Sequence, residues 1–146
     1  MSFFTDFLIA TKREAKKVAN TMNPTKTWPG FSYKNLTCLD LATLYGLMTG
    51  VTDADSVVEM EDEFEYLNSS DDESLELRLF PETFTKALAA VGSDEAARLA
   101  KGWHADEGGV SDWKMTEVRE LLNKLCELAR RAVKAHKPIM LCVSGF

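Results

Sequence analysis

The chain has 146 residues and a formal net charge of −6, with a sequence pI near 5.0. A length of this order predicts a single domain, residues 1–146, that buries enough surface to form one hydrophobic core. The negative charge argues against general binding to nucleic acid or to anionic membranes, because both depend on an excess of Lys and Arg.

The N-terminal third predicts a strand followed by two helices. Residues 3–10 are apolar and β-prone, which indicates a first strand. Thr11 and Glu14 have the spacing of a capping box, so a helix is expected to follow and to end at Asn23-Pro24. Residues 23–35 are expected to form a loop rich in aromatic side chains, and the apolar run 36–49 predicts a central, buried helix.

Residues 53–76 form an acidic segment that differs from the rest of the chain. It contains 11 of the 23 acidic residues and has neither Lys nor Arg. Apolar residues alternate with acids near its middle and its end. This pattern predicts a short helix or turn, followed by a hairpin that pairs residues 62–67 with residues 74–80.

The C-terminal half predicts three helices and a last strand. Pro81 and Ser93 are suited to helix starts, and the longest helix is expected to be capped by Ser111 or Asp112. That last helix has a continuous apolar stripe, made by Val118, Leu121, Leu122, Leu125, Leu128, Ala129 and Ala132. Residues 139–143 form an unbroken apolar run and predict a buried strand. The whole order predicts an α+β fold, with about five helices on a small sheet that has N-terminal and C-terminal strands and a central hairpin.

Two basic clusters are interpreted as ordinary surface. Lys12, Arg13, Lys16 and Lys17 could contact phosphate, but on an amphipathic helix such a cluster is usually a solvated face. The basic residues at the end of the long helix are those that a helix dipole favours, and they are Arg130, Arg131, Lys134 and Lys137.

The three cysteines, Cys38, Cys126 and Cys142, are far apart and lie among apolar neighbours. Such residues are best explained as reduced core thiols, which fits a cytoplasmic protein. The sequence has no paired His or Cys ligands with zinc spacing and no glycine-rich phosphate loop, so we expect neither a metal nor a cofactor. An enzyme is therefore less expected than a binding protein.

The leading hypothesis is a non-enzymatic protein-binding module that uses its acidic segment to occlude a basic protein partner, as an immunity or inhibitor protein would. A concentrated patch of one sign attracts a partner of the other sign. A compact acidic chain of this kind is similar in composition, though not in motif, to many bacterial toxin-neutralising proteins. The residues expected to contact the partner are Glu61, Glu63, Phe64, Glu65, Tyr66, Asp71 and Asp72.

The alternative hypothesis is a small-molecule-binding protein or enzyme with a pocket between the aromatic loop and the segment around His104. A histidine near carboxylates can act as a base or bind a metal. The residues of this alternative pocket are Trp28, Tyr33, Trp103, His104, Asp106 and Glu107.

Overall fold

The protein is built around a twisted antiparallel sheet. The computed structural model describes residues 3–67, 75–106 and 109–145. Within them the sheet has five strands in the order β2-β1-β5-β4-β3. Their bounds are Phe4–Ile9 for β1, Gly30–Lys34 for β2, Glu65–Leu67 for β3, Leu75–Leu79 for β4 and Ile139–Ser144 for β5. The β3–β4 pair is the central hairpin predicted from the sequence, with Tyr66 opposite Arg78.

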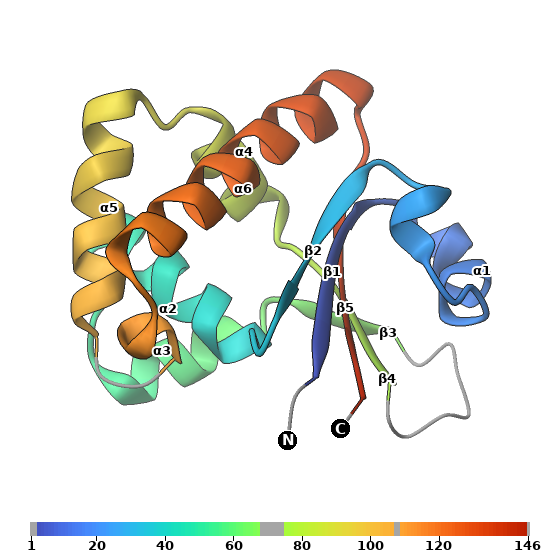
Figure 1. Ribbon diagram of the computed structural model, residues 1–146, viewed down its shortest axis with the longest axis horizontal. Helices are drawn as coiled ribbons and strands as arrows, with labels where there is room; N and C mark the ends of the chain where they lie inside the picture. Colours follow the sequence, from blue (N-terminus) through green and yellow to red (C-terminus); the bar gives the residue numbers. More distant parts are fainter. Residues whose placement is uncertain (1–2, 68–74, 107–108, 146) are drawn as a thin grey trace.

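Six α-helices flank the sheet in the part of the chain that the structure describes. They are α1 (Ala15–Ala19), α2 (Cys38–Thr49), α3 (Ala54–Glu61), α4 (Glu82–Ala89), α5 (Ser93–Ala105) and α6 (Met115–Ala135). Short 3₁₀ turns occupy Lys12–Glu14, Pro24–Lys26 and Gly109–Asp112. Helices α2 to α6 lie on one side of the sheet, and α1 lies alone on the other (Figure 1). This is the single compact α+β domain that the sequence predicts.

The main core fills the space between the sheet and the larger group of helices. Every residue of the predicted α6 stripe, from Val118 to Ala132, is buried there. From the sheet, Phe7, Leu141 and Val143 point into the same core. Trp103 of α5 is buried among them, and its indole N–H donates to the backbone oxygen of Asp40 at 3.1 Å. Helical periodicity therefore predicted the buried face of α6 correctly, because an apolar stripe along a helix faces the core.

The second face of the sheet has a smaller core beneath α1. Leu8, Leu77 and Met140 point to this side, and Val18 and Trp28 cover them. The predicted capping box is present: the carboxylate of Glu14 accepts from the backbone amide of Thr11 at 3.0 Å. The same carboxylate accepts from the indole N–H of Trp28 at 2.7 Å, which fastens the start of the helix to the turn before β2.

The prediction of a loop over residues 23–35 is wrong in part, because residues 30–34 form strand β2 at the edge of the sheet. Phe31 and Tyr33 alternate with polar residues, and β2 pairs with β1 through Phe31 opposite Phe7. The Pro-Gly signal before the strand hid this alternation. Gly30 is required at its position, since a Cβ there would lie 1.9 Å from the carbonyl oxygen of Phe7.

Three predicted helix boundaries also differ from the structure. Residues Gly109–Asp112 form a 3₁₀ turn, so α6 begins at Met115 and has Lys114, rather than Ser111 or Asp112, as its N-cap residue. The helix after Thr11 ends at Ala19 because Asn20 and Thr21 turn back to bond the carbonyl oxygens of Lys16 and Lys17. Pro81 precedes α4 as its cap instead of being its first helical residue.

Among the described residues, no helix combines the length and the apolar character needed to cross a bilayer.

Candidate functional site: an acidic surface on α3 and the hairpin

Helix α3 carries acids on its outer face and an apolar residue on its inner face. The carboxylate of Asp53 caps the helix by accepting from the backbone amide of Ser56 at 3.0 Å. Val57 points inward and is buried next to Gly46 of α2. The outer face follows helical spacing and consists of Asp55, Val58, Glu59 and Asp62, all of them exposed.

Val58 is an apolar residue on this outer face. It is 51% exposed, and by helical spacing it shares the face with Asp55, Glu59 and Asp62. The acids keep the helix soluble, and the valine adds apolar surface on the same face. An exposed apolar residue within a charged rim resembles the composition of a protein interface.

Phe64 connects this helix to the sheet and is not a surface residue. It is only 1% exposed, and its ring packs edge-on against Phe80 and Phe84 at centroid distances of 5.4 and 5.6 Å. A side chain held in the core in this way is unavailable to a partner. Phe64, which the sequence indicated as an apolar contact for the partner, is therefore a core residue that fixes the position of the acidic segment.

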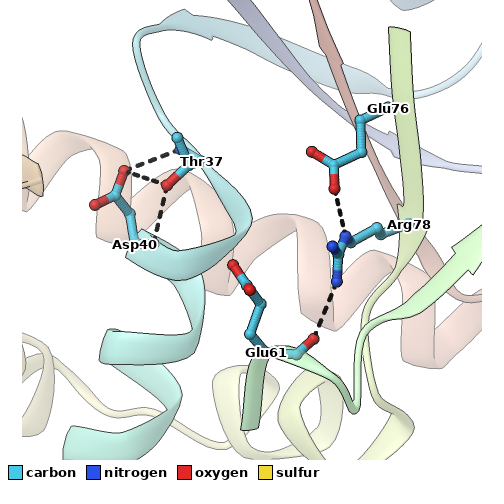
Figure 2. A network of polar contacts seen from close by, with 5 residues as sticks. All are labelled: Thr37, Asp40, Glu61, Glu76 and Arg78. Carbon is cyan, nitrogen blue, oxygen red and sulfur yellow. Dashed lines mark hydrogen bonds and ion pairs between the residues drawn. The ribbon is translucent and has the colours of Figure 1, made fainter. Parts of the chain in front are cut away.

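Arg78 of β4 holds the end of α3 against the hairpin (Figure 2). Its guanidinium donates to the carboxylate of Glu76 at 2.7 Å and to the backbone oxygen of Glu61 at 3.3 Å. The Arg78 guanidinium also lies 5.7 Å from the centre of the Tyr66 ring. Arg78 follows the acidic segment in the sequence. It therefore partly offsets the negative charge of this segment where α3 meets the hairpin.

Tyr66 completes the surface beside the end of α3. Its side chain is 57% exposed, and it stands on the face of the hairpin that carries Arg78. We call Asp55, Val58, Glu59, Asp62 and Tyr66 the acidic face. Two of these residues, Val58 and Tyr66, offer apolar surface, and the three acids are exposed.

The other predicted contact residues are divided between surfaces. Glu63 is exposed in the turn after α3, and the side chain of Glu61 is half-buried near Arg78. Glu65 points to the opposite side of the hairpin, where its carboxylate pairs with the Lys12 ammonium at 2.7 Å. Asp71 and Asp72 lie outside the described residues.

The sheet separates Trp28 from the other residues of the alternative pocket that the structure describes. Trp28 belongs to the small core beneath α1, whereas Trp103 is buried in the main core. Tyr33 stacks on Trp113 with ring centres 5.8 Å apart, and the His104 ring nitrogen lies 2.7 Å from the Trp113 backbone oxygen. Trp113 thus joins two of the predicted residues. Asp106 is exposed beyond the end of α5, and Glu107 lies outside the described residues.

The three cysteines are buried free thiols, as predicted. Burial raises the pKa of Cys38 to about 12, that of Cys126 to about 11 and that of Cys142 to about 12. At neutral pH all three are therefore protonated and poorly nucleophilic. In the described part of the chain, the structure also has no group of three or more His, Cys, Asp or Glu side chains that could hold a metal ion.

No family model, curated protein or solved structure matches the chain. The function proposed below therefore rests on geometry and charge.

Proposed function

We propose that the protein is a non-enzymatic binding module that docks a basic protein partner on its acidic face. The observation that carries the proposal is Val58, which is half exposed and shares the outer face of α3 with three exposed acids. An interface needs a desolvated apolar centre within a polar rim, and Val58 and the acids that share its face supply both kinds of group.

The two kinds of residue in the acidic face have different roles in this proposal. Asp55, Glu59 and Asp62 attract a basic partner over a distance and align it, which acts mainly on the association rate. Val58 and Tyr66 contribute short-range contacts that form after encounter, which act mainly on the dissociation rate. The Tyr66 ring is already oriented by the Arg78 guanidinium beneath it.

In its most specific form, the proposal is an inhibitor or immunity protein that occludes an active-site cleft. The carboxylates of the acidic face would occupy the place of an anionic substrate, and the apolar pair would seal the contact. If the captured partner is an enzyme with such a substrate, an excess of this protein is expected to inhibit it competitively. Inhibition that added substrate does not relieve would exclude occlusion.

The first experiment compares four immobilised baits in a native lysate at low and moderate salt. They are the wild type, the charge variant Glu59→Gln/Asp62→Asn, the anchor variant Val58→Ser and the matched control Asp112→Asn/Glu127→Gln. The control removes the same charge from exposed positions outside the acidic face. We expect a basic protein that the wild type and the control retain and that both face variants lose.

Binding kinetics with the captured protein then separate the two roles. The charge variant is expected to slow association about threefold to tenfold at low salt, with a smaller effect at moderate salt. Val58→Ser is expected to accelerate dissociation instead. Equal retention by all four baits, with all four folded by circular dichroism, would overturn the proposal.

A further inference from the structure

A second surface of opposite charge lies on the other side of the sheet. A groove of about 1100 Å³ runs between α1, the turn before β2 and the C-terminal end of α6. Antiparallel pairing of β1 with β5 creates it, because Ile9 at the end of β1 lies opposite Ile139 at the start of β5. The residues that leave β1 and those that arrive from α6 are therefore brought to the same end of the sheet (Figure 1).

Five cations from three segments line this groove. Arg13, Lys16 and Lys17 come from the 3₁₀ turn and α1, Arg131 comes from α6, and Lys137 follows it. Within the described residues, none of the five has a carboxylate within ion-pair distance, whereas Lys12, Lys86 and Lys124 each have one. All five side chains belong to exposed residues. The groove thus concentrates positive charge on a chain whose net charge is −6.

Among the described residues, Glu14 is the single carboxylate in the lining, and its hydrogen bonds are directed within the protein. It accepts from the Thr11 amide and hydroxyl and from the Trp28 indole. These bonds, with a smaller contribution from Lys137, lower the pKa of Glu14. The group therefore stays ionised and offsets about one of the five positive charges, which leaves an excess for an anionic ligand.

The size and composition of the groove indicate the kind of ligand. Pockets for small molecules are commonly about 300–1000 Å³ and bury most of the ligand. This groove is larger and open, and its charges are spread over separate segments. Ile9, Trp28 and Pro29 add apolar groups to the lining. A ligand that fits carries several spaced anionic groups with apolar groups between them.

We propose that the groove binds an acidic peptide segment of a partner protein. Carboxylates of such a segment would pair with Arg13 and Arg131, whose planar guanidinium groups match carboxylates in two-point contacts. A nucleic-acid strand carries charge at every nucleotide and needs an extended basic track. Here a carboxylate borders the basic residues, because Lys12, which directly precedes Arg13, already pairs with Glu65 of the hairpin.

The test uses a short fluorescein-labelled peptide in which Glu alternates with Leu and Ser, measured by fluorescence anisotropy at two salt concentrations. Arg13→Glu/Arg131→Glu is expected to weaken binding about tenfold or more. Its matched control is Arg98→Glu/Lys101→Glu, which makes the same change of charge at exposed positions of α5. The control is expected to retain most of the affinity.

A milder pair, Lys16→Gln/Lys17→Gln, covers the case in which the charge reversals disturb folding, which a thermal melt would reveal. This pair is expected to weaken binding and to reduce its salt dependence. Equal losses in the groove variant and the α5 control would overturn the proposal, because they would indicate an effect of net charge alone. Tighter binding of an oligo-dT strand than of the peptide, or complete competition by inorganic tripolyphosphate at a similar concentration, would overturn it in favour of a phosphate ligand. The acidic face is unchanged in these variants, so failure here leaves the proposed function separately testable.

Discussion

Arg78 shows how one residue can organise a surface to which it contributes little area. Its guanidinium joins the side chain of Glu76 to the end of α3 (Figure 2). It also lies over the ring of Tyr66. The ion pair with Glu76 is partly shielded from water, with side-chain exposures of 18% and 27%. A pair in this setting contributes more than an exposed pair such as Lys12 with Glu65, where both side chains are at least half exposed.

Arg78→Met is expected to lower the free energy of unfolding by about 1–3 kcal/mol. Methionine keeps much of the aliphatic length but leaves the Glu76 carboxylate and the Glu61 carbonyl oxygen without their donor. Urea unfolding measures the loss, and Arg98→Met on exposed α5 is the control. A loss below about 0.5 kcal/mol would show that water replaces the guanidinium at no cost, as at exposed pairs.

The sequence predicted the acidic segment but not this cation. Arg78 follows the segment by only two positions, yet its role depends on the hairpin register that places it opposite Tyr66. Phe64 shows the same limit in the other direction. It lies among acids in the sequence, which indicated a surface position, but the turn after α3 directs its ring into the aromatic cluster. Alternation along a strand defines two faces without stating which one is buried.

At the scale of elements, the position of the acidic face depends on the contact between α2 and α3. Gly46 of α2 lies where the chain returns into α3. A Cβ at this position would lie 2.4 Å from the Val51 carbonyl oxygen and 3.3 Å from a methyl group of Val57. The Val51 amide also donates to the Gly46 carbonyl at 2.8 Å. The glycine therefore allows a close approach that any side chain would prevent.

Gly46→Ala is expected to destabilise the protein by about 1–3 kcal/mol, the usual range for overpacking a filled site. The backbone carbonyl of Val51 cannot move aside as a flexible side chain would. Gly102→Ala is the matched control, because a Cβ there would meet only Leu47 methyl groups at 3.7 Å. The measurement is urea unfolding of both variants. If Gly46→Ala is as stable as Gly102→Ala, the α2–α3 contact has room for an additional methyl group.

Local patterns predicted the long elements well and the groove poorly. The α6 stripe and strand β5 were predicted because their periodicity involves only neighbouring residues. The groove joins Arg13, Lys16 and Lys17 to Arg131 and Lys137, which are more than 110 positions away in the chain. Each cluster alone has an ordinary explanation, solvation in one case and the helix dipole in the other. Only the β1–β5 pairing brings them together.

At the scale of the whole molecule, β5 joins the two halves of the sheet. It pairs with β1 on one side and with β4 on the other, and residues Ile139 to Val143 are all buried. The small core beneath α1 and the main core both use its side chains. The acidic face and the basic groove are therefore held in a fixed relation through one strand.

Leu141→Pro is expected to unfold the whole domain rather than one edge. Proline removes a backbone donor from a central strand, a position where sheets essentially exclude it, and typical domains are only marginally stable. Circular dichroism and a urea titration measure the effect, with Leu141→Ile as the control for side-chain shape. A variant that keeps a cooperative transition near that of the control would show that the halves of the sheet fold without β5.

The place of β5 in chain order also has a consequence during synthesis. The ribosome makes β1 and β2 first and the β3–β4 hairpin later, and β5, the strand that joins them, is made after α1 to α6. Until residue 144 has been made, β1 and β4 each present an unpaired edge. Open edges of this kind pair readily with other chains. A nascent chain of this protein is therefore most exposed to aggregation, and most in need of a chaperone, immediately before β5 appears.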